Sequence, residues 1–256
     1  MKWTTLFQVE LTKIRRSKIL LLLILPSLIL WIPNVMNSSL NFQMDDIGIS
    51  PENSFLIQGF MGLAWFLYPA FLVVLTVMLW QTERSGRGIV KMLSLPASPS
   101  AFSLVKFLLL LGLSAIQVFF SVVCYYGAAF AASRLNDYDF LVSPLFVGRF
   151  AFFLWLTCIP MAALFWMIST CIRTSVFSAA AGLALIVPSV LLINTKIWFL
   201  YPVCYPFYYL IHEYSKLAST MTPDELPLAP WILSAAAFTV ACLAASCIRF
   251  GKKEIQ

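Results

Sequence analysis

The sequence predicts an all-α integral membrane protein, with six transmembrane helices, a preceding amphipathic helix at the membrane interface and both termini in the cytoplasm. Composition is the first observation: 61% of the 256 residues are hydrophobic and 11% are charged, too little polar surface for a soluble globule. The second is that the apolar stretches far exceed the roughly 10 residues of a barrel strand. Third, all but four of the 17 Lys and Arg residues fall on one side of the six-span pattern, as expected for cytoplasmic loops.

Residues 1–18 are expected to form an amphipathic helix that lies on the inner membrane surface. Trp3, Phe7, Leu11 and Ile14 recur at helical spacing, which places them on one face. Such a helix buries its apolar face at the headgroup boundary and turns its cations towards anionic membrane lipid. The segment before the apolar run is too long for a typical signal peptide, so we expect it to be retained.

The predicted transmembrane helices follow in one domain that covers residues 1–256. They are residues 19–36, 55–80, 107–132, 150–170, 176–194 and 230–248. Each is close to the roughly 20 apolar residues that cross a ~30 Å hydrocarbon core. The four cations on the side opposite the termini are Arg134, Arg149, Lys196 and Lys216.

Two segments between the predicted spans are candidates for function. Residues 81–105 form the longest inner loop, and 88–94 within it predict a short amphipathic helix that ends before Pro96. This loop either presents apolar side chains to a partner or is simply solvated. Residues 197–229 begin with a run dense in Trp, Tyr and Pro, a composition typical of the membrane interface, and are expected on the outer face.

Several kinds of chemistry are disfavoured by the sequence. It has no Gly-x-x-x-x-Gly-Lys-Ser/Thr motif, so we expect no ATP hydrolysis by this chain and no enzyme activity. The single histidine, His212, belongs to no metal-binding motif. The net charge of +6 lies in short loops next to the membrane, which orientation and anionic lipid explain without nucleic acid.

The energy for any transport is expected to come from outside the chain. The middle of each predicted span lacks Asp, Glu, Lys, Arg and His, the residues that proton-driven transporters place at membrane depth. The sequence does not exclude a sodium-driven transporter, which can bind sodium through backbone carbonyl groups.

Two motifs flank the first two predicted spans. Residues 10–18 read ELTKIRRSK, before the first span. After the second come Glu83, Gly86 and Gly88, Leu95-Pro96-Ala97-Ser98 and Lys106. In these motifs, their order and the number of spans, the chain resembles the permease subunits of type-2 ABC exporters, and within them the permeases of lantibiotic-immunity and bacitracin-resistance systems.

The resemblance implies a division of labour between chains. A separate cytoplasmic ABC ATPase, in two copies, would bind ATP and magnesium, and this chain would hold no cofactor. The 81–105 loop would be the coupling segment and residues 1–18 the connecting elbow. The candidates for ATPase contact are Glu83, Arg84, Gly88, Lys91, Met92, Leu95 and Pro96, and those for the elbow are Glu10, Lys13 and Arg16.

The resemblance also implies a second permease, either a homologous chain or another copy, in a bacterial plasma membrane. The cargo would be an amphipathic antimicrobial peptide. A drug or lipid permease and a membrane sensor or scaffold without transport activity are the alternatives. The candidates for substrate contact are Trp198, Tyr201, Tyr205, Tyr208, Tyr209, Gln117 and Asn194, although an interfacial belt or helix packing explains the same residues.

Overall fold

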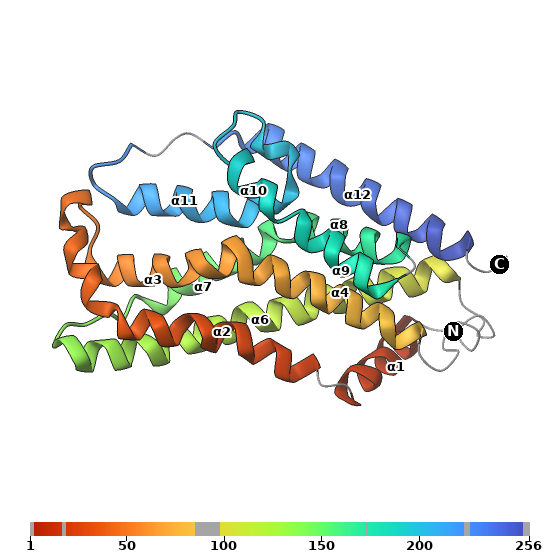
Figure 1. The fold of residues 1–256 in the computed structure, drawn as a ribbon, viewed down its shortest axis with the longest axis horizontal. Helices are drawn as coiled ribbons and strands as arrows, with labels where there is room; N and C mark the ends of the chain where they lie inside the picture. Colours follow the sequence, from red (N-terminus) through yellow and green to blue (C-terminus); the bar gives the residue numbers. More distant parts are fainter. Residues whose placement is uncertain (1–2, 17–18, 85–97, 173, 223–225, 253–256) are drawn as a thin grey trace.

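The computed structural model describes residues 3–16, 19–84, 98–172, 174–222 and 226–252, and within these residues it is helical without strands. The described α-helices, in chain order, are α1 (Trp3–Arg16), α2 (Ile19–Met36), α3 (Pro51–Gly62), α4 (Tyr68–Arg84), α6 (Pro99–Asn136), α7 (Pro144–Thr157), α8 (Ile159–Cys171), α9 (Ser175–Ala184), α10 (Val187–Leu192), α11 (Tyr205–Leu217) and α12 (Leu228–Lys252). Most of the long helices run along one common axis, while α1 is tilted and α10 is short (Figure 1). The predicted helical class is confirmed.

Short helical segments complete the chain. The π-helical η2 (Leu63–Leu67) joins α3 to α4, so these form one continuous rod. The 3-10 segment η1 (Ser38–Ile47) follows α2, and η4 (Trp198–Leu200) and η5 (Pro202–Cys204) precede α11.

Five helical stretches are long and apolar enough to cross a membrane. They are Pro51–Gln81, Pro99–Asn136, Pro144–Cys171, Ser175–Leu192 and Leu228–Arg249. Each one overlaps a predicted span, from the second to the sixth. The first predicted span has the same bounds as α2, but its described apolar part, Leu22–Met36, is shorter than the other five. The total of six spans and the cytoplasmic side of the termini stay predictions.

The third predicted span is much longer as a helix. α6 has 38 residues, about 57 Å at 1.5 Å per residue, so it extends beyond a ~30 Å hydrocarbon core. The Ser98 hydroxyl accepts a hydrogen bond from the Ala101 amide at its start, and Asp137 adopts the left-handed conformation (φ 50°) at its end. Residues 99–105, expected in the coupling loop, are therefore helical, as are 81–84 at the end of α4.

The two ends of the bundle carry different elements. α1, the end of α4, the start of α6 and the end of α12 lie together at one end, which we call the α1 end (Figure 1). η1, the start of α3 and the start of α7 lie at the opposite end, the η1 end. The elements predicted for the cytoplasmic face thus share the α1 end.

Small residues allow close helix packing. Trp31 of α2 lies at the site that a Cβ on Gly59 of α3 would occupy, with a ring atom 2.3 Å from it. The Trp31 ring also packs on Phe60 (5.5 Å between centroids) and Tyr125 (5.4 Å). Such close approach is how helices associate in membranes, where lipid supplies no hydrophobic drive between them.

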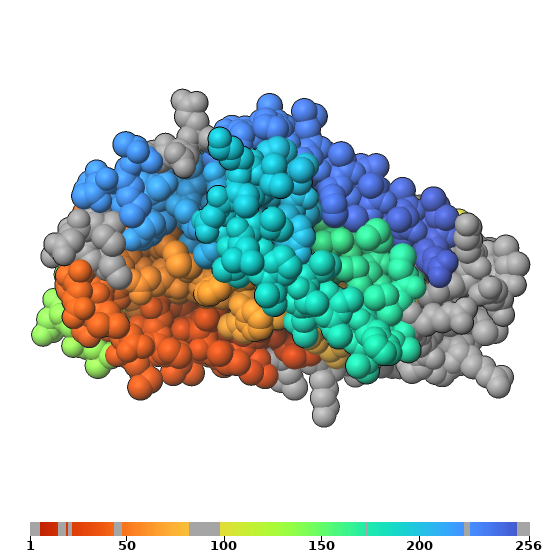
Figure 2. Space-filling model, turned by 45° about the horizontal axis from the view of Figure 1, so that its top comes forward, coloured from red at the N-terminus to blue at the C-terminus, as the bar shows by residue number. Residues whose placement is uncertain are grey.

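The segment predicted for the outer face, 197–229, contains a helix that belongs to the bundle. α11 runs along the bundle axis and contacts α3 and α7 (Figure 1). Tyr205, Tyr209 and Leu210 of α11 are buried. Figure 2 shows the neighbouring face, where the residues of α9 and α10 lie on the outside of the molecule, and α9 packs on α4 beneath.

Candidate functional site

The elbow helix α1 packs against α6 through a face that the predicted apolar stripe matches only at Ile14. Leu6, Glu10 and Ile14 are buried, whereas Phe7 and Leu11 of the predicted stripe are 37% and 44% exposed. The helix therefore has two apolar faces, one against the bundle and one pointing away from it. The outward face is free to meet the headgroup boundary of a membrane.

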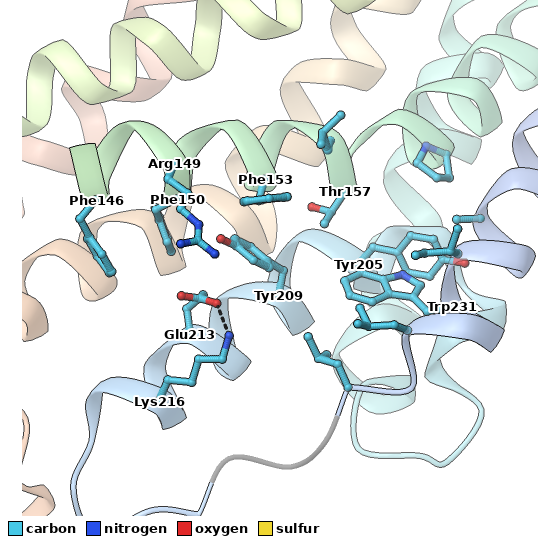
Figure 3. Close-up of a pocket in the computed structure, with 16 residues that line it drawn as sticks. Phe146, Arg149, Phe150, Phe153, Thr157, Tyr205, Tyr209, Glu213, Lys216 and Trp231 are labelled. Carbon is cyan, nitrogen blue, oxygen red and sulfur yellow. Dashed lines mark hydrogen bonds and ion pairs between the residues drawn. The ribbon is translucent and has the colours of Figure 1, made fainter. Parts of the chain in front are cut away.

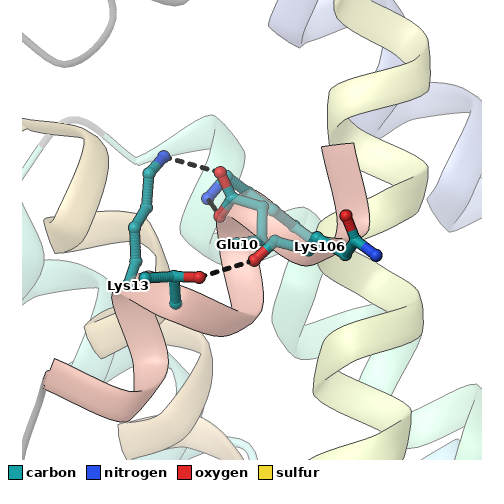
Figure 4. A network of polar contacts seen from close by, with 5 residues as sticks. Glu10, Lys13 and Lys106 are labelled. Atoms are coloured by element: carbon teal, nitrogen blue, oxygen red, sulfur yellow. Dashed lines mark hydrogen bonds and ion pairs between the residues drawn. The ribbon is translucent and has the colours of Figure 1, made fainter. Parts of the chain in front are cut away.

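A buried ion pair fastens α1 to α6. The Glu10 carboxylate lies 2.5 Å from the Lys106 Nζ and 2.6 Å from the Lys13 Nζ, as Figure 4 shows. The Lys106 side chain is fully buried, that of Glu10 is 4% exposed, and that of Lys13 is 37% exposed. Lys106, expected to open the third span, is instead within α6, about two turns after Pro99.

Most coupling candidates are outside the described residues. This holds for Gly88, Lys91, Met92, Leu95 and Pro96. Glu83 and Arg84 end α4, and Arg16 ends α1, but the structure does not describe their side chains. The two helices that flank the segment, α4 and α6, reach the α1 end beside the elbow (Figure 1).

Three of the aromatic candidates hold the chain between α10 and α12 in place. The Trp198 ring stacks on Tyr208 with centroids 3.5 Å apart and meets Trp231 edge-on at 5.1 Å. The Tyr201 hydroxyl donates to the Leu185 carbonyl (2.5 Å). Burial raises the pKa of Tyr201 to about 12, so this donor keeps its proton at physiological pH. Packing accounts for these residues without a ligand.

The other two aromatic candidates line a cavity of about 690 Å³ between α7, α11 and the start of α12 (Figure 3). Tyr205 and Tyr209 face it from α11, and Trp231 faces it from α12. Phe150 and Phe153 form much of the α7 wall. The volume is within the roughly 300–1,000 Å³ of small-molecule sites.

Charged groups gather at one end of the cavity. Lys216 donates to the Glu213 carboxylate (2.8 Å) within α11. Arg149 of α7 points towards this pair in Figure 3, with its guanidinium 5.8 Å from the Phe153 ring centroid. Burial, with the nearby Glu213 carboxylate, raises the pKa of Tyr209, while Arg149 acts in the opposite direction. The phenol is therefore neutral, and the three charged side chains together carry one net positive charge.

The remaining candidates, Gln117 and Asn194, are not at the cavity. Gln117 is fully buried, and its amide donates to Ser27 of α2 (3.1 Å), which in turn pairs with Ser121 (2.8 Å). This network joins α2 to α6, the packing role that intramembrane polar groups commonly have. Asn194 is exposed just after α10.

The sequence analysis did not predict two of the residues that line the cavity together with Tyr205 and Tyr209. Arg149 completes the cavity from α7, far along the chain from α11, and Trp231 does so from α12, the next helix after α11. No local pattern marks either residue. The described residues contain no group of three or more His, Cys, Asp and Glu side chains suited to a metal ion.

One comparison with known proteins identifies a family. A family model described as ABC-2 family transporter protein matches residues 6–212, from α1 to α11. No curated protein and no solved structure matches the chain. The match covers α1 from Leu6 onward, the Glu10–Lys106 ion pair and the α7 wall of the cavity, and it ends before Glu213, Lys216 and Trp231.

Proposed function

Because the chain belongs to the ABC-2 family of transporter proteins, we propose that this permease subunit of an ABC transporter exports an amphipathic antimicrobial peptide of the lantibiotic type. Family membership confirms the type-2 ABC resemblance of the sequence. In the proposal, the complex resides in a bacterial plasma membrane with both termini of this chain in the cytoplasm. It removes the peptide from the membrane and so protects the cell.

The energy comes from a second protein. Permeases of this family generally work with a cytoplasmic ABC ATPase. In the proposal, two ATPase copies bind ATP and magnesium and contact the 81–98 region of each permease. The candidates for this contact are Glu83, Arg84, Gly88, Lys91, Met92, Leu95 and Pro96. A second permease, homologous or identical, completes the transport path.

The observation that carries the proposal is the buried attachment of the elbow beside this region. The Glu10–Lys106 ion pair joins α1 to the start of α6, and in the proposal these two segments move together. α6 runs without a break to the η1 end. A displacement of the coupling segment at the α1 end is thus passed along a rigid rod to the other end of the bundle.

The proposed transport cycle uses that connection. ATP binding closes the two ATPases and draws the coupling segments together, and the attached rods rock against those of the partner permease. The change needs contacts that differ between the two states, which a bistable interface of rigid helices supplies. The path then opens on the side away from the ATPase. Trp198, Tyr201, Tyr205, Tyr208 and Tyr209 are the candidates to meet the emerging peptide.

Reconstitution with the ATPase tests the coupling. We expect Leu95→Asp to lower peptide-stimulated ATP turnover by at least about tenfold, because a charge replaces an apolar contact. Leu141→Asp is the matched control, since this half-exposed leucine lies between α6 and α7 at the η1 end. The assay adds a purified lantibiotic to the assembled complex in liposomes. Unchanged turnover in the Leu95→Asp complex would overturn the coupling assignment.

A further inference from the structure

The cavity between α7, α11 and α12 has a charged end and an apolar remainder. Arg149, Glu213 and Lys216 gather at the charged end (Figure 3). Beyond them the walls are mostly aromatic and aliphatic, with Phe153 and Trp231 among them. A ligand that matches this polarity has one compact charged group and a hydrocarbon tail.

The net positive charge at the charged end of the cavity favours a ligand with an anionic group. The Glu213 carboxylate already pairs with Lys216 at 2.8 Å. Among the described residues, no carboxylate lies within ion-pairing distance of Arg149, whose recorded contact is the Phe153 ring. A guanidinium presents a planar fork of donors that fits a phosphate in bidentate fashion. Arg149 is therefore placed to bind a phosphodiester.

The length of the cavity fits one leaflet of a bilayer. Arg149 is five residues after Pro144, so it is about 7 Å from the start of α7, at the η1 end. Pro160 of α8, the last lining residue along this stretch of chain, is eleven residues further, or at most about 16 Å along the axis. Half of a ~30 Å hydrocarbon core is about 15 Å. The depth available to a tail thus equals the depth of one leaflet.

From these features we propose that the cavity binds one glycerophospholipid molecule of the leaflet at the η1 end. Its phosphodiester lies on the Arg149 guanidinium, and one acyl chain lies along Phe153, Tyr205 and Trp231. The bound lipid fills the space between α7, α11 and α12 and joins α11 to the bundle. In this proposal Tyr205 and Tyr209, which line the cavity, contact a resident lipid and not the exported peptide.

The walls favour an acyl chain over a peptide. A peptide placed in the apolar part would bury backbone N–H and C=O groups, each of which needs a hydrogen-bond partner. The side-chain polar groups that the lining offers there are the Thr157 hydroxyl, the Trp231 indole N–H and the hydroxyl groups of Tyr205 and Tyr209. The Tyr205 hydroxyl already contacts Phe199 and Ser234. A hydrocarbon chain needs no such partner.

Native mass spectrometry of the purified full chain in mild detergent tests the proposal. The probes are dioleoylphosphatidylglycerol, dioleoylglycerol without the phosphate, and glycerophosphoglycerol without the chains. We expect one phosphatidylglycerol per chain, at least tenfold weaker retention of dioleoylglycerol, and no retention of glycerophosphoglycerol. Equal retention of the two dioleoyl lipids would overturn the role of Arg149. Retention of glycerophosphoglycerol would overturn that of the acyl chain.

Two variants locate the lipid. Arg149→Gln changes an exposed side chain and should fold, with phosphatidylglycerol affinity reduced about tenfold or more. Lys196→Gln removes an exposed cation that does not line the cavity and should keep wild-type affinity. Gel filtration and helix content confirm folding of both. Equal losses in the two variants, or none in Arg149→Gln, would refute the site.

A second measurement, tryptophan fluorescence quenching, locates the acyl chain in the cavity. Phosphatidylglycerol brominated on its acyl chains should quench tryptophan fluorescence, and Trp231→Phe should remove the quenched fraction that saturates at one lipid per chain. Quenching that persists in Trp231→Phe would contradict the placement. Displacement of the lipid by a lantibiotic would instead make the cavity a cargo site. Neither assay involves an ATPase, so a failure here leaves the proposed export function to be judged by turnover alone.

Discussion

Glu10→Gln is expected to release the elbow helix α1 from the bundle. The substitution takes the negative charge away from a fully buried Lys106 ammonium group while it keeps the shape of the side chain. Removing one partner of a buried ion pair costs about 3–5 kcal/mol. At about 1.4 kcal/mol per tenfold, the ratio of attached to detached α1 should fall by more than about a hundredfold.

Lys13→Gln is the matched control, because Lys13 pairs with the same carboxylate. Its side chain is 37% exposed and pairs three residues along the same helix. Exposed pairs of this kind contribute about 0.2–1 kcal/mol. We therefore expect at most about a fivefold change in the ratio.

The ratio of attached to detached α1 is measured by hydrogen exchange of the α1 backbone amides. Both variants are labelled in one mild detergent and analysed by mass spectrometry. Under conditions where exchange reports the opening equilibrium, protection of α1 should fall more than about a hundredfold in Glu10→Gln and little in Lys13→Gln. The amides of α7 should keep their protection in both variants. Equal protection of α1 in Glu10→Gln and Lys13→Gln would refute the reasoning, as would loss of protection throughout the chain.

Three glycine substitutions test the packing. Gly59→Ala places a Cβ 2.3 Å from the Trp31 ring, and Gly182→Ala places one 2.7 Å from Val73, so each should cost about 1–3 kcal/mol in thermal unfolding. Gly112→Ala has nothing within 4 Å and should be neutral or, through helix propensity, stabilising by up to about 1 kcal/mol. Similar unfolding temperatures for all three would contradict these contacts.

Apolar length was sufficient to predict the five stretches that are long and apolar enough to cross a membrane, but it fixed the ends of some helices better than others. The first predicted span has the bounds of α2. α6 extends further because its ends are set by the Ser98 cap and the left-handed Asp137, which lie beyond the apolar run. A hydropathy pattern identifies the part of a helix that can cross the hydrocarbon core. It does not identify the helical turns that extend beyond the apolar run.

The sites depended more strongly on tertiary contacts. Glu10 and Lys106 belonged to separate motifs in the sequence, and their ion pair joins residues 96 positions apart. Tyr205 and Tyr209 were predicted as contacts from composition, yet the cavity exists because α7 and α12 bring Arg149 and Trp231 opposite them. No pattern within one helix encodes such a meeting.

Affinity purification of the tagged chain from its native host in mild detergent, with mass spectrometry of the proteins that accompany it, tests the permease function most directly. We predict a stoichiometric ATPase with a phosphate-binding loop, together with a second permease chain or a second copy of this one. Recovery of the chain without any ATPase, from preparations shown to preserve other membrane complexes, would contradict the account.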